Sequence, residues 1–250
     1  MSTTQVVRPG KSAPSSGLRG ITERYFYFFM SLLIAVTVVY GFSQTVGQNL
    51  FNPAPSRPIL LFLHGAVFSG WVVFFIFQSA LVRTHHVSWH RRTGWFGAGL
   101  GALIPILGAV ISVVMARFDV FQLHQPRDQR APFTLIPLFD MVCFTSTFWL
   151  AVLWRKRPEY HRRLVFVASC SLTAAAFFRF PEAFHSHIYF YAGVDALIFL
   201  GVIRDLVVSR RVHAVYLWAL PAFALGQYLV MHTISTGAQW WLKIADAIVG

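Results

Sequence analysis

Charged residues are scarce in this chain. Asp, Glu, Lys and Arg make up 12% of its 250 residues, whereas hydrophobic residues make up 56%. A soluble domain usually carries about 25% charged residues. This composition excludes an ordinary water-soluble globular protein and indicates that lipid is the main solvent of the chain.

Several chemistries lack the residues that they require. The sequence has no Gly-rich phosphate loop, CxxC or CxxCH motif, so phosphate-loop nucleotide binding, dithiol redox chemistry and covalent haem attachment are not indicated. Its three lysines, Lys11, Lys156 and Lys243, lie away from the centres of apolar runs, which argues against a retinal Schiff base. Both cysteines, Cys143 and Cys170, fall inside apolar runs, where we expect them to be buried rather than disulfide-bonded.

The chain contains seven long apolar runs. A helix needs about 20 apolar residues to span the hydrocarbon, and a chain in lipid must satisfy its own backbone hydrogen bonds. Runs that alternate with period two are absent, which argues against a barrel. The sequence therefore predicts an all-α, seven-helix transmembrane bundle. The predicted spans are 25–46, 59–82, 94–116, 131–154, 164–180, 188–203 and 214–234.

The rest of the chain falls into two short segments. Residues 1–24 are rich in Ser, Thr, Pro and Gly with interspersed arginines, and are predicted to form a disordered basic tail. Residues 25–234 form the membrane domain, and residues 235–250 form a short C-terminal segment. The first apolar run is too long for a signal peptide and lacks a small-x-small site, so we expect an uncleaved anchor. The sixth span reaches full length only by continuing through Arg204 and Asp205 to Val208.

Basic residues alternate from one connection to the next. Fifteen of the 21 lysines and arginines lie in the tail and in the second, fourth and sixth connections. The positive-inside rule then places the N-terminus in the cytoplasm and the C-terminus outside, in a bacterial-type inner membrane. The net charge of +12 is accordingly a topology signal. It is compatible with contacts to lipid headgroups and does not indicate a nucleic-acid partner.

Two connections contain the same short pattern. An aromatic-His-Arg-Arg segment opens the third span at residues 89–92 and the fifth span at residues 160–163. The pattern is compatible with a repeated two-helix unit, or simply with the Arg and aromatic residues that gather at cytoplasmic helix ends. The third span also contains a GxxxG step, Gly97 and Gly101, which predicts a central position for it because small residues allow close helix packing.

Ionisable groups are predicted to gather in the outer half of the membrane. From a rise of 1.5 Å per residue, His64 lies about 7 Å, Asp195 about 10 Å and Asp140 about 14 Å from the outer ends of their helices. The cytoplasmic halves of the helices are expected to contain fewer polar and ionisable groups. Intramembrane ionisable groups usually face an interior or a water-filled cavity, so the sequence predicts an outward-facing cup, walled by aromatic residues and floored by Asp140. Its candidate residues are His64, Asp140, Arg179, His187, Tyr191, Asp195 and His232.

Three kinds of ligand fit such a cup. His64, Asp140, His187 and Asp195 are suitable ligands for a divalent metal ion, His64 with His187 or His232 for haem b, and Arg179 for the anionic group of an organic ligand or lipid. The alternative is a purely structural role, with Arg179 paired to Asp140 or Asp195. The sequence thus leaves three hypotheses for function and names no reaction. They are a ligand- or metal-binding membrane protein, a haem b redox protein, and a structural or assembly factor without a ligand.

Several motifs between residues 59 and 213 resemble a group of uncharacterised bacterial multi-pass membrane proteins. The resemblance implies a membrane class and no particular activity, and this chain has Val165 where that pattern usually has Met. The residues that carry it are His64-Gly65, Trp71, Gln78, Val82, His90-Arg91-Arg92-x-Gly94, Asp140, His161-Arg162-Arg163-Leu164, Ala168 and Arg179.

Two described groups are more distantly similar. Ferric-reductase-like and b-type cytochrome domains share the His-Arg-x-x-Gly helix start, but the paired haem histidines inside their helices have no counterpart here. The haemolysin III and progestin-receptor type is similar in helix number, but its HxxxH on the last helix is missing from this chain.

Overall fold

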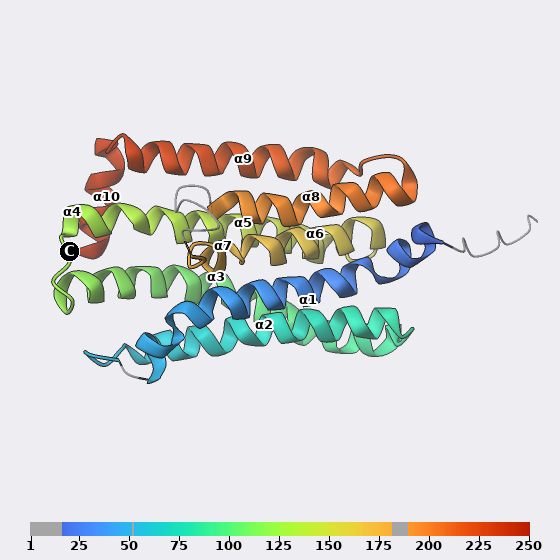
Figure 1. Ribbon diagram of the computed structural model, residues 1–250, viewed down its shortest axis with the longest axis horizontal. Coiled ribbons are helices and arrows are strands. Elements are labelled where there is room, and N and C mark those ends of the chain that lie inside the picture. Colours follow the sequence, from blue (N-terminus) through green and yellow to red (C-terminus); the bar gives the residue numbers. More distant parts are fainter. Residues whose placement is uncertain (1–16, 52, 182–189) are drawn as a thin grey trace, which may run out of the picture.

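The computed structural model describes residues 17–51, 53–181 and 190–250, and every regular element in these ranges is a helix. The all-α prediction is therefore confirmed. In chain order (Figure 1) the elements are α1 (Leu18–Val46), η1 (Gly47–Phe51), α2 (Ile59–Arg83), α3 (Val87–Phe121), α4 (Arg127–Arg130), η2 (Ala131–Thr134), α5 (Leu135–Leu153), α6 (Pro158–Ser171), α7 (Ala174–Phe177), α8 (Phe190–Ser209), α9 (Ala214–Ser235) and α10 (Gln239–Val249).

Five helical stretches are long and apolar enough to cross a membrane. They are Arg19–Phe51, Ile59–Arg83, Val87–Phe121, Arg127–Leu153 and Ala214–Ser235. Large side chains on their outer surfaces, such as Val39, Val73 and Leu217, are more than half exposed, as expected of helices that face lipid. The chain is a multi-pass integral membrane protein built as a helical bundle.

The fifth and sixth predicted spans correspond to helices that are not among the five long apolar stretches. The run 164–180 is divided between α6 and α7, with a break where the Thr173 hydroxyl donates to the carbonyl oxygen of Cys170 at 2.6 Å. Of the run 188–203, residues 190–203 belong to α8, which does continue through Arg204 and Asp205 and ends at Ser209, and residues 188 and 189 lie outside the described residues. Three charged residues within α8 set it apart from the five strongly apolar stretches.

The long helices run side by side along the long axis of the molecule (Figure 1). At one end, here called the N-terminal end, lie the start of α1 and the α2–α3, α5–α6 and α8–α9 connections. At the other end, called the C-terminal end, lie α4, α10 and the C-terminus. The basic connections around Arg91, Arg157 and Arg210 therefore share the N-terminal end, as the alternation of charge predicted.

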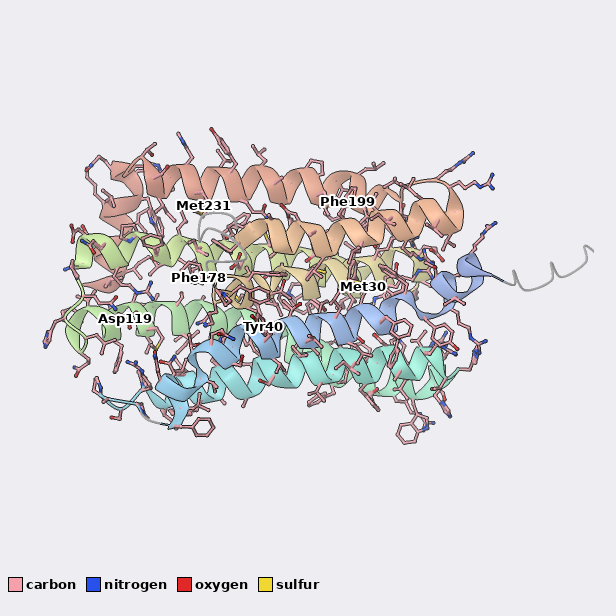
Figure 2. The ribbon with its side chains drawn as sticks, viewed as in Figure 1. Met30, Tyr40, Asp119, Phe178, Phe199 and Met231 are labelled. Carbon is pink, nitrogen blue, oxygen red and sulfur yellow. The ribbon has the colours of Figure 1, made fainter. Side chains whose placement is uncertain are left out.

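The main core forms where α1, α6, α8 and α9 meet. Ile34, Phe166, Ile198 and Val215 are each no more than 2% exposed, and Met30, labelled in Figure 2, belongs to the same cluster. Because lipid is as apolar as these side chains, close packing favours the association of the helices more than the hydrophobic effect does.

Glycines on α3 make room for aromatic rings of its neighbours. A Cβ atom added at Gly97 would lie 2.3 Å from the Phe74 ring of α2, and one at Gly101 would lie 2.2 Å from the Phe148 ring of α5. The GxxxG step is thus a surface that receives side chains from two helices. This agrees with a central α3, which packs against both α2 and α5.

A direct approach of two backbones occurs elsewhere, between α1 and α7. A Cβ atom at Gly41 would lie 2.3 Å from the carbonyl oxygen of Ala176. Backbone cannot move aside as a side chain can, so this crossing depends on the absence of a side chain at Gly41.

The ends of the membrane domain carry additional helix. α1 begins at Leu18, so it takes in residues 18–24 of the predicted tail, while residues 1–16 lie outside the described residues. The C-terminal segment 235–250 contains α10. The Trp241 indole N–H donates to the carbonyl oxygen of Pro132 at 2.9 Å, and Arg117 Nε donates to that of Ile248 at 3.0 Å. This short helix therefore packs against α3 and η2 at the C-terminal end.

Candidate functional site

The predicted floor residue of the cup, Asp140, is buried and bound by another predicted residue. It lies in α5 and is 8% exposed, and its Oδ1 accepts a hydrogen bond from the Tyr191 hydroxyl of α8 at 3.0 Å. Tyr191 is 6% exposed, and its ring meets Phe139 edge to face with centroids 6.3 Å apart. The structure thus joins α5 and α8 through a carboxylate and a phenol.

A second acid follows one helical turn later on α8. Asp195 lies four residues after Tyr191, on the same face of α8, and is half-buried. Its Oδ1 accepts a hydrogen bond from Gln227 Nε2 of α9 at 3.0 Å. Cys143, one turn after Asp140 on α5, lies within electrostatic range of both acids. We call Asp140, Tyr191, Asp195 and Gln227 the acidic group.

Sequence reasoning overlooked Gln227. Its side chain is 6% exposed, and a polar amide inside the apolar run 214–234 was a usable signal, because buried polar side chains need hydrogen-bond partners. Gly226 beside it has the Phe139 ring 2.5 Å from the position of an added Cβ, so α9 packs tightly against α5 here.

His64 and Arg179 lie within electrostatic range of each other, near α1. Arg179 Nε donates to the Thr45 hydroxyl at 3.3 Å, Arg179 Nη1 donates to the carbonyl oxygen of Ala175 at 2.5 Å, and the guanidinium lies 4.4 Å from the centre of the Phe42 ring. His64 is half-buried with its ring against Phe68, and its Nδ1 has no hydrogen-bond partner among the described residues.

The ion pairs that the alternative, purely structural role gave to Arg179 are not formed among the described residues. Among the described residues, no ion pair or hydrogen bond links Arg179 to Asp140 or Asp195, because each acid is instead bound by an uncharged side chain on a neighbouring helix. The single predicted cup therefore consists of two groups. The acidic group lies between α5, α8 and α9, and the His64–Arg179 group lies between α1, α2 and the end of α7.

The other two predicted histidines do not extend either group in the part of the chain that the structure describes. His232 is exposed on α9 and stacks with Tyr228 at 5.7 Å between ring centres. In Figure 1, the helices that carry His232 and His64, α9 and α2, lie on opposite sides of the bundle. His187 lies outside the described residues. The haem hypothesis thus has no facing pair among the predicted histidines that are described.

The proposed metal ligands are also not gathered. Within residues 17–51, 53–181 and 190–250, no group of three or more His, Cys, Asp or Glu side chains is close enough to hold a metal ion. A hollow of about 620 Å³ does open at the C-terminal end between α4 and α10. It is lined by Arg127, Asp128, Ala131, Pro132, Leu242, Ala245 and Asp246, none of which was predicted.

The N-terminal end of the bundle, where few buried ionisable groups were expected, contains an extensive buried ion network. Asp205 of α8 is fully buried. Its Oδ1 accepts from Arg163 Nη2 at 2.6 Å and from Arg204 Nη1 at 2.8 Å, and its Oδ2 accepts from Arg163 Nε at 2.9 Å and from the backbone N–H of His213 at 3.2 Å. The network joins α6, α8 and the start of α9.

Glu159 completes this network at its solvent-facing side. Its Oε2 accepts from Arg163 Nη1 at 2.6 Å and from Arg162 Nη2 at 2.5 Å. The signal in the sequence was the adjacent pair Arg204 and Asp205 at the end of an apolar run, since charges there are retained only when paired.

The two aromatic-His-Arg-Arg segments meet at this same end. The His90 ring of α3 and the His161 ring of α6 lie edge to face with centroids 6.3 Å apart. His161 Nδ1 is 2.9 Å from the carbonyl oxygen of Ala151, whereas His90 Nδ1 is buried without a partner among the described residues. This contact agrees with a repeated two-helix unit and equally with a gathering of Arg and aromatic residues at one end of the bundle.

Comparison of the chain with protein-family models, with curated proteins and with solved structures found no match.

Proposed function

We propose that the protein binds a small cationic ligand at the acidic group, which is reached from outside the cell. In this proposal the N-terminus is cytoplasmic, the C-terminal end of the bundle faces outward, and the membrane is a bacterial-type inner membrane. Binding, rather than a chemical reaction, is the activity that these residues support, because the group holds no paired nucleophile and base.

One observation carries the proposal. Asp140 and Asp195 are two carboxylates in the interior of a membrane bundle, and the partners that the structure gives them, Tyr191 and Gln227, are uncharged. Carboxylates away from water are usually paired with a positive charge or protonated. Within the described residues neither acid forms an ion pair, in contrast to Asp205, which contacts two arginines.

The uncharged partners are suited to a binding site. Tyr191 and Gln227 each donate to one carboxylate oxygen, Oδ1, and thereby hold the acids in position while leaving them uncompensated. A cation that arrives would replace a proton or supply the missing charge. Ligand binding is therefore expected to depend on pH and to require both acids.

A structural role is the competing proposal, and the same contacts favour it. The Tyr191–Asp140 bond ties α8 to α5, and the Gln227–Asp195 bond ties α8 to α9. Such bonds between membrane helices are worth about 0.6 kcal/mol on average. This reading predicts that Asp140→Asn and Asp195→Asn change stability and affect no binding.

Native mass spectrometry of the protein extracted in mild detergent tests the proposal. We expect a non-covalent small-molecule adduct on the wild-type protein that is lost in Asp140→Asn and in Asp195→Asn. Asp246→Asn is the matched control, because Asp246 lies on α10 with 58% of its side chain exposed. An adduct that persists in both variants, or a wild-type protein without one, would contradict the proposal. An absorption spectrum of the same sample would reveal haem b by a Soret band.

The orientation is tested separately. An alkaline phosphatase fused after Gly250 should be active, because that enzyme matures only outside the cytoplasm. A fluorescent protein that needs the cytoplasm to mature, fused at the same residue, should be dark. The opposite pair of results would place the acidic group near the cytoplasm.

A further inference from the structure

The buried ion network at the N-terminal end leaves two arginines incompletely paired, Arg162 at its Nε and Arg204 at two nitrogens, and of the two only Arg204 is fully buried. Arg204 is 2% exposed, and only its Nη1 is bound, to Asp205 Oδ1 at 2.8 Å. Its Nε and Nη2 are buried and have no hydrogen-bond partner among the described residues. Arg163, by comparison, has a partner for each of its three guanidinium nitrogens.

Asp205 cannot supply the missing partners. Its two oxygens already accept four hydrogen bonds, from Arg163 twice, from Arg204 and from the backbone of His213. A carboxylate offers about four lone-pair sites, so this acceptor is saturated. Glu159 is bound to Arg162 and Arg163 at the exposed side of the network, where over half of its side chain is exposed.

Two tyrosine side chains near Arg204 also have buried polar atoms. The Arg204 guanidinium carbon lies 5.6 Å from the centre of the Tyr27 ring of α1. The Tyr216 hydroxyl of α9 lies against Gly201, one turn before Arg204 on α8, only 2.3 Å from the position of an added Cβ. Both hydroxyl oxygens are buried, and each lies close to the other, but neither forms a hydrogen bond of normal geometry in the described part of the chain.

The balance of charge around these groups is positive. Arg162, Arg163 and Arg204 face two carboxylates, Asp205 and Glu159. One positive charge is left in excess, and the unpaired atoms are guanidinium N–H donors and hydroxyls. An unpaired buried donor is costly, and an unpaired buried charge is costlier still. A small negative ion would satisfy the donors and neutralise the excess charge together.

We propose that Arg204, Tyr27 and Tyr216 form a buried binding site for a halide ion between α1, α8 and α9. A halide fits better than phosphate or a lipid headgroup, because the donor atoms are enclosed by packed helices and a single atom needs little room. Guanidinium N–H and phenol O–H groups both donate readily to such an ion. The site does not depend on the proposed function of the acidic group.

The full-length protein in detergent provides the test. Its Tm is measured as chloride or bromide replaces gluconate at constant ionic strength. We expect a saturable increase with either halide. Tyr27→Phe and Tyr216→Phe remove one hydroxyl each and keep the ring, so each should raise the apparent halide Kd about tenfold or more. Tyr228→Phe is the matched control, because Tyr228 is 63% exposed on α9, and it should keep the wild-type Kd.

Bromide also reports its own position through anomalous X-ray scattering. A bromide peak beside Arg204 that weakens in Tyr216→Phe would support the site. Three results would overturn the proposal: no saturable halide effect on the wild-type Tm, unchanged halide affinity in both tyrosine variants, or stabilisation by phosphate but not by halide. Ordered water is the alternative partner for these donors, and it predicts the first of these results.

Arg204 itself is tested with a conservative change, because removal of the side chain would also disrupt the bond to Asp205. Arg204→Lys retains the charge and loses the forked donors, so it should lower halide affinity at least tenfold. Arg211→Lys is its control, because Arg211 is exposed near the same end of the bundle. Equal halide affinity in the two lysine variants would contradict the role given to Arg204.

Discussion

The Tyr191 hydroxyl of α8 donates to Asp140 of α5 at 3.0 Å, and both side chains are less than 10% exposed. This bond connects two residues that lie 51 positions apart in the chain. It holds the Asp140 side chain in place without pairing it with a positive charge, which distinguishes the acidic group from the ion network at the N-terminal end of the bundle.

Removing this hydroxyl should destabilise the protein measurably. Tyr191→Phe keeps the ring beside Phe139 and leaves the buried Asp140 oxygen without its donor. We expect a loss of about 0.6 kcal/mol, and at most about 1.7 kcal/mol, in the free energy of unfolding, seen as a lower Tm in detergent. Tyr228→Phe, at an exposed position of α9, should leave the Tm unchanged. Equal Tm values for the two variants would show that the bond contributes nothing.

Neutralising Asp205 should have a larger effect. Asp205→Asn leaves Arg163 and Arg204 buried without the acid that pairs with both. Breaking a buried ion pair by removing one partner costs roughly 3 to 5 kcal/mol, so we expect low yield or a strongly reduced Tm. The matched change Asp246→Asn alters an exposed pair with Arg127 and should cost less than about 1 kcal/mol. A small effect at Asp205 would argue against the network.

A methyl group at the α1–α7 crossing should separate the two helices. Gly41→Ala places a Cβ against the carbonyl oxygen of Ala176, where the backbone cannot yield without moving the helix. Overpacking of this kind costs typically about 1 to 3 kcal/mol. Gly99→Ala is the control, because nothing lies within 4 Å of an added Cβ there, and alanine in a helix is favoured over glycine by up to about 1 kcal/mol. Thermal unfolding of both variants in parallel gives the comparison, and a Tm for Gly41→Ala at or above the wild-type value would refute the close crossing.

The stability of the protein should depend on pH through Glu159 at the N-terminal end. Partial burial opposes ionisation of Glu159, but the hydrogen bond from Arg163 and the charges of Arg162 and Arg163 outweigh it and hold its pKa below the usual value. A lowered pKa stabilises the fold at pH values above the unfolded pKa of about 4.3, and this contribution is lost as the pH falls through the folded pKa.

The Tm difference between the wild-type protein and Glu159→Gln measures this contribution. It should be constant from neutral pH down to about pH 5 and shrink below about pH 4. The glutamate side chain is over half exposed, so the contribution should stay under about 1 kcal/mol. A difference that is the same at pH 7 and at pH 3 would mean that the ion pair is not the cause.

The sequence predicted many residues of the candidate site, but it did not predict which of them contact one another. Depth and helix periodicity correctly marked Asp140, Tyr191 and Asp195 as interior residues of α5 and α8, because polar groups in apolar runs turn inward. They could not exclude His232, which lies near the end of α9 and is exposed there. They also underestimated Arg163 and Arg204, because arginines near helix ends are usually exposed at the membrane surface.

The sequence by itself determined that the chain lies in lipid, that it is helical, and which helix ends lie together at one end of the bundle. Charge content, run length and arginine spacing depend on local composition, and lipid imposes its rules on each segment separately. The tertiary structure alone decided which polar groups meet. A period of 3.6 residues tells which side chains share a face of a helix, but the rotation of that helix and the neighbour it packs against depend on the complete set of contacts in the bundle.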